Sequence, residues 1–140
     1  MVFNLLIVDD SVSMRRIIKR VITLSGVSAG DIYEAENGIE AFKVLAGKKI
    51  DIVLSDIHMP EMDGIVLLEK IKNNKALRHI PVVMVTTEAR EPLVNKVMEL
   101  GAAGYIVKPF RPEEIKNLLQ NILGVEDVGD DAAEFTEGDF

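Results

Sequence analysis

Polar residues that can take part in chemistry occur at four places in this sequence, each after a short apolar run. In chain order they are Asp9 with Asp10, Asp56, Thr86 and Lys108. Apolar runs of this length, rich in Val and Ile, are typical of strands buried in a parallel sheet. Because parallel strands end at the same edge of a sheet, we expect these five side chains to lie together.

Three carboxylates at one edge require neutralisation, because buried like charges are costly. A hard divalent cation such as Mg²⁺ takes carboxylate, backbone and water oxygens, and Lys108 can offset the remaining charge. A carboxylate such as Asp56 can attack phosphorus to give an acyl phosphate. Phosphoryl transfer then depends on positioning and charge stabilisation, with Thr86 as a hydrogen-bond donor to the phosphoryl group. Taken singly, each of these residues also fits a helix cap or a solvated strand end.

Strands and helices are predicted to alternate five times along the chain. The apolar runs predict strands at residues 5–8, 32–35, 52–54, 82–85 and 105–107. Apolar residues at helical spacing predict helices over residues 14–21, 39–45, 65–71, 94–100 and 115–122. Strict alternation with short connections favours an α/β fold, a doubly wound parallel sheet of five strands with right-handed crossovers.

Helix caps and one turn can be predicted locally. Ser11 or Ser13 can cap the first helix, and Asn37-Gly38 is typical of a turn. The first helix also carries four basic residues opposite its apolar face, which we interpret as a solvated surface rather than a docking surface. They are Arg15, Arg16, Lys19 and Arg20.

Charge divides the chain at residue 124. Seven of its 23 acidic residues, and no Lys or Arg, lie in residues 124–140, so the 16 remaining acidic residues match the 16 Lys and Arg of residues 1–123. We expect residues 124–140 to be a disordered or loosely docked acidic tail. A neutral body argues against binding nucleic acid by bulk electrostatics.

Features that are absent from the sequence bear on the cellular compartment and on the class of protein. The sequence contains no Cys, which excludes disulfides and thiol chemistry and fits a reducing cytoplasm. No apolar run approaches the roughly 18 residues of a membrane span, and the first residues do not resemble a signal peptide.

These residues resemble a known family. On five strand–helix units, Asp9-Asp10, Asp56, Thr86 and Lys108-Pro109-Phe110 are similar to the receiver domain of bacterial two-component response regulators. The resemblance covers residues 4–123. The stretches VDDSVSMRR, MPEMDG, VVMVTTEA and GAAGYIVKPF resemble the stand-alone chemotaxis regulators of the CheY type, which have the flavodoxin-like fold.

The resemblance implies a role for each matching residue. Asp56 is then the phospho-acceptor, and Asp10 and Asp56 bind Mg²⁺ together with the backbone carbonyl of His58, while Asp9 acts through water. Lys108 binds a phosphoryl oxygen and precedes a cis Pro109. Thr86 and Tyr105 then form the conformational switch.

It also implies a function. Residues 1–123 form a receiver that takes a phosphoryl group from a histidine kinase and signals by protein–protein contact, with a flagellar motor switch component as target and a phosphatase as a further partner. The alternative within the same class is a phosphorelay intermediate or phosphate sink that does not contact the motor. Such a switch catalyses its own phosphotransfer and dephosphorylation but is not otherwise an enzyme. His58 and Glu88 lie where side chains would flank the phosphoryl group, and we hypothesise that they tune its lifetime. Ser11 takes the place of a bulkier residue and leaves the entry to the site more open.

Two other classes of protein share some of these sequence features. A phosphohydrolase with an aspartyl nucleophile typically has a second acid two residues later, where this chain has His58. A flavin-binding module of the flavodoxin sort needs a phosphate loop rich in Ser, Thr and Gly after the first strand. This chain has Asp9-Asp10 there, which would repel phosphate in the absence of a metal.

Overall fold

Five strands and five helices alternate in the computed structural model, which describes residues 2–59, 62–87 and 90–124. The strands are β1 (Phe3–Val8), β2 (Ala29–Ala35), β3 (Ile52–Asp56), β4 (Val82–Thr86) and β5 (Gly104–Val107). The helices are α1 (Val12–Ser25), α2 (Gly38–Gly47), α3 (Gly64–Lys72), α4 (Glu91–Glu99) and α5 (Pro112–Leu123). The predictions for Glu88 and for the acidic tail beyond Gly124 lie outside the described residues.

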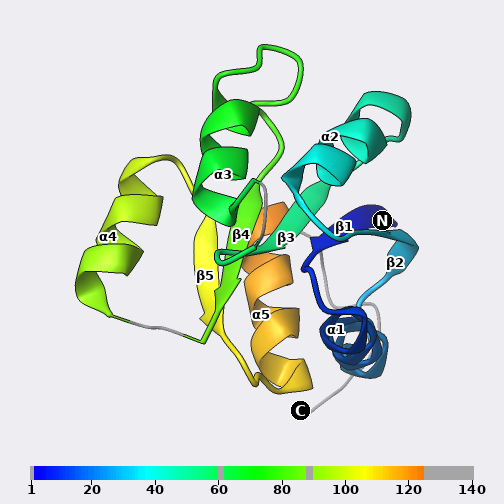
Figure 1. Cartoon of the computed structure of the whole chain (residues 1–140). Helices are drawn as coiled ribbons and strands as arrows, with labels where there is room; N and C mark the ends of the chain where they lie inside the picture. The colour runs from blue at the N-terminus through cyan, green and yellow to red at the C-terminus, as the bar shows by residue number, and fades with distance from the viewer. Residues whose placement is uncertain (1, 60–61, 88–89, 125–140) are drawn as a thin grey trace.

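All five strands form one parallel sheet in the order β2-β1-β3-β4-β5, which confirms the predicted doubly wound fold. Helices α1 and α5 cover one face of the sheet, and α2, α3 and α4 cover the other (Figure 1). Strand ends are in register, since Val8 pairs with Ser55, and Asp56 with Val85. The residues that follow β1, β3 and β4 therefore reach the same edge.

Side chains of alternating direction build two separate cores from the same strands. In β1, Leu6 and Val8 pack beneath α2 and α3, whereas Leu5 and Ile7 pack beneath α1 and α5. All four are at most 1% exposed. A strand that is apolar on both faces must be covered on both faces, which is why β1, β3 and β4 each contain a continuous apolar run.

The capping residues were predicted in part. Ser11 is the N-cap of α1, accepting a hydrogen bond from the Met14 backbone N–H at 3.1 Å, and Gly26 ends the helix at φ 82°. The separate turn predicted at Asn37-Gly38 is wrong. Asn37 instead caps α2, because its side-chain oxygen accepts the otherwise unpaired N–H of Glu40 at 2.9 Å, and Gly38 is already helical.

Strand β2 lies at the edge of the sheet, as its weaker apolar pattern predicted, but it starts at Ala29 rather than at Ile32. The extra residues pair with β1 across an irregularity between Phe3 and Leu5. Within the described part of the chain, no helix is long and apolar enough to cross a membrane.

Candidate functional site

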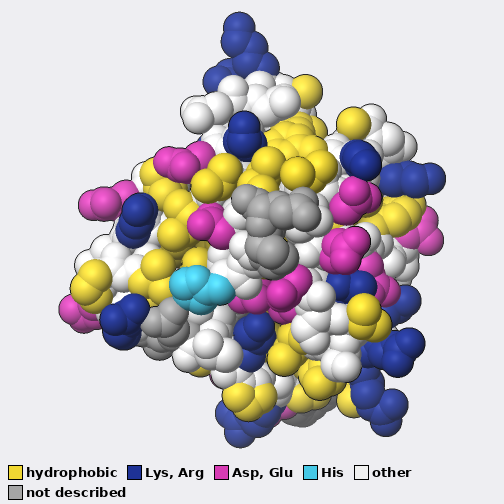
Figure 2. All heavy atoms as spheres, in the orientation of Figure 1, with side chains coloured by type: hydrophobic (Ala, Val, Ile, Leu, Met, Phe, Trp, Pro, Cys, Tyr) yellow, Lys and Arg dark blue, Asp and Glu magenta, His cyan; other side chains and the backbone are white. Residues whose placement is uncertain are grey.

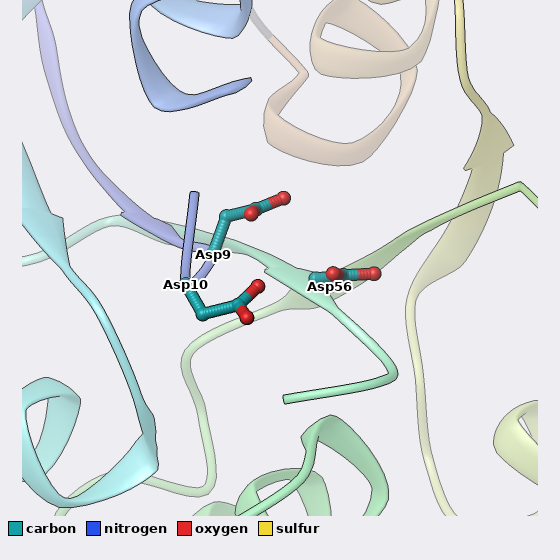
Figure 3. A group of neighbouring side chains, drawn as sticks. All are labelled: Asp9, Asp10 and Asp56. Atoms are coloured by element: carbon teal, nitrogen blue, oxygen red, sulfur yellow. The ribbon is translucent and has the colours of Figure 1, made fainter. Parts of the chain in front are cut away.

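Three carboxylates meet at the edge where the strands end. Asp9 and Asp10 follow β1, and Asp56 is the last residue of the neighbouring β3, so the three side chains lie next to one another (Figure 3). One oxygen from each lies within 4.8 Å of the others. Asp9 is 1% exposed, Asp56 is half-buried and Asp10 is exposed. The sequence-based prediction that these residues converge is confirmed.

Lys108 is the cation of the cluster. Its Nζ lies 3.3 Å from Asp9 Oδ2 and 3.6 Å from Asp56 Oδ1, with only 10% of the side chain exposed. It follows β5, two strands away from Asp56, and its backbone N–H donates to the Thr86 carbonyl at 2.8 Å. Its peptide bond to Pro109 is cis, as the resemblance implied.

The cluster carries more negative than positive charge. Burial is the main cause that raises the pKa of the Asp56 carboxyl above its ordinary value; nearby Asp9 raises it further, while Lys108 acts in the opposite direction. Three carboxylates against one ammonium leave an excess of two negative charges when all are ionised. Oxygen donors with that excess fit a hard divalent cation such as Mg²⁺, which Asp9, Asp10 and Asp56 could hold.

Arg15 belongs to this site, although its sequence context suggested only a solvated helix face. Its Nη1 donates to the Asp9 backbone oxygen at 2.5 Å, and its Nε pairs with Glu34 Oε1 at 2.9 Å. The side chain is 13% exposed, so the prediction of a solvated position is wrong for this residue. The available signal was its spacing: Arg15 lies one helical turn after the N-cap Ser11, close to the residues that follow β1.

Thr86 and Tyr105 lie on the strands beyond Asp56. Thr86 ends β4, directly beside β3, and is 2% exposed. Tyr105 lies on the edge strand β5 and is 41% exposed. Tyr105 pairs with Met84, so it lies two residues before Val107, the partner of Thr86.

The loop after Asp56 packs closely against the site. His58 is exposed and follows Asp56 by two residues. Gly64 opens α3, and its N–H donates to the Ile57 carbonyl at 2.7 Å. A Cβ on Gly64 would lie 2.1 Å from the Asp56 carbonyl oxygen, so no larger residue fits without moving the chain beside Asp56.

The site opens onto one face of the molecule. Acidic side chains gather near the middle of this face with a basic side chain beside them (Figure 2). Asp10 is exposed and Asp56 is half-buried, so an ion or a phosphorylated group can reach these two carboxylates from solvent, whereas Asp9 and Lys108 are largely buried.

Comparison with known proteins identifies the family. The model of the response regulator receiver domain matches residues 5–120. Chemotaxis protein CheY1 of Helicobacter pylori is 42% identical over 125 residues, covering 89% of this chain and 99% of its own. A CheY homologue of Campylobacter jejuni is 41% identical over 132 residues, covering 94% of this chain and 99% of its own.

Solved structures agree with these relatives. The chemotaxis response regulator CheY4 of Vibrio cholerae superposes with a TM-score of 0.77 at 29% identity, covering 87% of this chain and 99% of that one. A response regulator described as putative, from Chloroflexus aurantiacus, gives a TM-score of 0.81 at 26% identity, covering 89% and 100%. The family match, the relatives and the acidic strand ends agree, and the chain belongs to the response regulator receiver domain family, as a homologue of CheY chemotaxis proteins.

Proposed function

We propose that this protein accepts a phosphoryl group on Asp56 from a histidine kinase, in the presence of Mg²⁺, and signals in chemotaxis by binding other proteins. The observation that carries the proposal is the position of Asp56 beside two further carboxylates, 3.6 Å from the ammonium group of Lys108. The matched relatives, named as chemotaxis proteins, support the pathway.

The chemistry is a phosphoryl transfer between two residues. A carboxylate oxygen of Asp56 attacks the phosphorus of a phosphohistidine, the new P–O bond forms, and the P–N bond breaks. The leaving imidazole takes up a proton, and Asp56 becomes an acyl phosphate. Water later attacks the same phosphorus and releases inorganic phosphate, which returns Asp56 to the carboxylate.

The protein's part in this step is to position groups and to balance charge. Asp10 and Asp56 would hold Mg²⁺ with the His58 backbone carbonyl, and Asp9 would contact it through water. Bound there, the ion supplies positive charge to the phosphoryl oxygens. Lys108 moves little to reach the same oxygens, because its Nζ already lies between Asp9 and Asp56.

The proposed response to phosphorylation is a change in the protein surface on the side of the sheet that carries Thr86 and Tyr105. Thr86 would donate its hydroxyl to the phosphoryl group, and Tyr105, now 41% exposed, would turn inward. The changed surface then binds a downstream protein, for which a flagellar motor switch component is the proposed target. A cytoplasmic location follows from these proposed partners.

His58 and Glu88 are proposed to set the lifetime of the phosphorylated state. His58 is exposed and lies two residues from Asp56 in the chain, where its side chain can influence the approach of water. Exchanging both residues should change the dephosphorylation rate measured after the phosphodonor is removed. An unchanged rate would exclude the pair from this role.

Incubation with acetyl phosphate and Mg²⁺ tests the proposal without a cognate kinase. Wild-type protein should gain one phosphoryl group per chain by intact-mass measurement, in an acid-stable and base-labile form. Asp56→Asn should gain none, and Asp51→Asn, at the opposite edge of the sheet, should react like wild type. Labelling that persists in Asp56→Asn would overturn the assignment of Asp56, and many turnovers on phosphomonoesters would indicate a phosphohydrolase instead.

A further inference from the structure

The two acidic residues that follow β1 are held in different ways. The Asp9 carboxylate accepts the Ser11 backbone N–H at 2.9 Å and lies 3.3 Å from Lys108 Nζ. Asp10 is exposed, and within the described ranges no hydrogen bond or ion pair involves its carboxylate. Its place beside Asp56 (Figure 3) therefore depends on the backbone that carries it.

An arginine of α1 holds the backbone just before Asp10. The carbonyl of Asp9 accepts a hydrogen bond from Arg15 Nη1 at 2.5 Å, and the Asp9 N–H donates to the Ala35 carbonyl of β2 at 3.1 Å. A charged donor makes a stronger hydrogen bond than a neutral one. Because a peptide unit is planar, fixing the Asp9 carbonyl also fixes the direction in which the chain enters Asp10.

Arg15 is in turn held from β2. Its Nε donates to Glu34 Oε1 at 2.9 Å, and Glu34 lies on β2, where it pairs with Ile7 of β1. Only 13% of the Arg15 side chain and 33% of the Glu34 side chain are exposed. A guanidinium presents its donors in a rigid fork, so one group can bind two acceptors in a fixed geometry. Arg15 therefore links α1, the residue after β1 and the end of β2.

The contact between Arg15 and Glu34 is not part of either apolar core. Both residues line a polar hollow of about 250 Å³ together with Glu36 and Glu40. An ion pair beside such a hollow contributes little to stability, because water competes for both charges. Its main consequence is therefore the position that it gives to the Arg15 guanidinium, beside the Asp9 carbonyl.

We propose that Arg15 is a positioning residue for the magnesium site. Supported by Glu34, its guanidinium holds the peptide unit that precedes Asp10, so that the Asp10 carboxylate lies where an ion shared with Asp56 requires it. In this role neither Arg15 nor Glu34 contacts the ion. The inference rests on the proposed binding of Mg²⁺ by Asp10 and Asp56, and it adds the residues that set the affinity of that site. Losing a residue that orients a metal ligand typically weakens metal binding by about 10- to 100-fold.

The sign of the effect separates positioning from simple charge. A cation close to a metal site repels Mg²⁺, so charge alone predicts that Arg15→Gln binds the ion more tightly. Positioning predicts the opposite, a dissociation constant raised by about 10-fold. Arg16→Gln removes the same charge from the next residue, which is exposed and has no ion pair within the described ranges. Its dissociation constant should stay within about twofold of the wild-type value, because solvent and salt screen an exposed charge.

Titration of the full chain with Mg²⁺ gives these dissociation constants without any phosphorylation. The backbone amide shifts in ¹⁵N NMR spectra follow the titration, and the same spectra show that each variant is folded. The ¹³C resonance of the Asp9 carbonyl should also move in Arg15→Gln and stay in place in Arg16→Gln, because Arg15, not Arg16, donates to that carbonyl.

Variants of the acidic partner test the support from β2. Glu34→Gln should weaken Mg²⁺ binding more than Glu36→Gln, which removes the same charge from the same hollow but has no hydrogen bond or ion pair with Arg15 within the described ranges. Adding Glu34→Gln to Arg15→Gln should change the dissociation constant by no more than about twofold, because Glu34 acts through Arg15. A double variant that binds much more weakly than Arg15→Gln would overturn the part assigned to Glu34.

Wild-type protein and Asp10→Asn separate this inference from the proposed function. If wild type binds no Mg²⁺, or if Asp10→Asn binds it as tightly, the magnesium site itself is wrong and the inference falls with it. If wild type binds the ion and Asp10→Asn does not, an unchanged or lowered dissociation constant in Arg15→Gln overturns the positioning role alone. Should Arg15→Gln fail to fold, equal dissociation constants for Glu34→Gln and Glu36→Gln would overturn that role as well.

Discussion

Two partly buried lysines lie at opposite edges of the same sheet, and their ammonium groups have different partners. Lys108, where the strands end, contacts the carboxylates of Asp9 and Asp56. Lys72, where the strands begin, donates instead to the backbone carbonyls of Arg78 and Ile80 at 3.1 and 3.0 Å. Burial alone lowers the pKa of the Lys72 ammonium, and within the described ranges no carboxylate pairs with it.

The two edges of the sheet therefore differ in role. At the edge where the strands begin, Lys72 holds neighbouring turns together, and we call the edge where the strands end, with Lys108 and the three carboxylates, the reactive edge. Lys72 closes the loop between α3 and β4, and its stem packs under Gly101, so its contacts hold two turns together. Lys108 lies among three carboxylates whose total charge it cannot balance. Uncompensated charge is costly to fold and is retained at sites that bind ions or reacting groups. Variants at the two edges should therefore alter different properties.

The largest expected effect concerns the two lysines themselves. Lys108→Met should slow phosphorylation by acetyl phosphate by about 100-fold or more, because it removes a cation that stabilises the transferring group. Lys72→Met should phosphorylate within about twofold of wild type, a comparison made from initial rates at saturating Mg²⁺. Equal losses in both variants would show that the two edges do not differ in function.

Glycines at the two edges should differ in stability. Gly64→Ala should lower the free energy of unfolding by about 3 kcal/mol, since the new Cβ overlaps the Asp56 carbonyl. Gly47→Ala, at the end of α2, meets nothing within 4 Å and should be neutral or stabilising by about 0.5 kcal/mol. Urea unfolding curves measure both, and a Gly64 variant as stable as wild type would contradict the close packing beside Asp56.

Mg²⁺ should stabilise the protein through the reactive edge alone. At 100 times its dissociation constant, a ligand of the folded state adds about 2.7 kcal/mol to the free energy of unfolding. Asp10→Asn should lose most of this increment. Asp51→Asn should keep it, because Asp51 accepts the Asn4 N–H at the other edge. Thermal unfolding with and without Mg²⁺ gives the increment, and its persistence in Asp10→Asn would place the ion elsewhere.

Lys72 should matter for stability. Lys72→Met leaves the Arg78 and Ile80 carbonyls without these donors, at a cost of about 1–2 kcal/mol in the free energy of unfolding. Lys72→Arg should recover part of the loss if either carbonyl remains within reach. A Met variant with wild-type stability in urea would mean that these hydrogen bonds contribute nothing.

The smallest expected effect is the pH dependence of stability caused by Asp56. Its pKa is raised in the folded protein, mainly by burial, so its ionised form opposes folding. This contribution favours folding at low pH and is lost as the pH rises through the folded-state pKa. Without Mg²⁺, Asp56→Asn should therefore be more stable than wild type at pH 7, and the difference should shrink as the pH falls toward 4. A difference in stability that grows on acidification would mean that the ionised form of Asp56 favours folding, which contradicts the prediction.

The contacts that the sequence predicts are those that the topology of the parallel sheet determines. Asp9, Asp56 and Lys108 could be placed together because parallel strands bring their ends to one edge, whatever the side-chain details. Arg15 could not, since its role depends on the distance between α1 and Glu34 at the end of β2. A basic residue one helical turn after the N-cap fits a solvated helix face equally well.

Lys72 and Asn37 illustrate the same limit. The sequence shows a lysine at the end of a helix, and only the packed loop beyond it reveals which carbonyls the ammonium group meets. Asn37-Gly38 is typical of a turn, but the side-chain oxygen of Asn37 serves equally well as a helix cap. Local signals identified the residues that matter, and the tertiary contacts determined what each of them does.

Identification of the phosphorylated residue tests the central claim most directly. Borohydride reduces an aspartyl phosphate to homoserine, so protein treated with acetyl phosphate and Mg²⁺ can be reduced, digested and sequenced by mass spectrometry. The predicted result is homoserine at position 56 and at no other aspartate. Homoserine at position 9 or 10, or none in protein that has gained a phosphoryl group, would contradict the assignment of Asp56 as the phospho-acceptor.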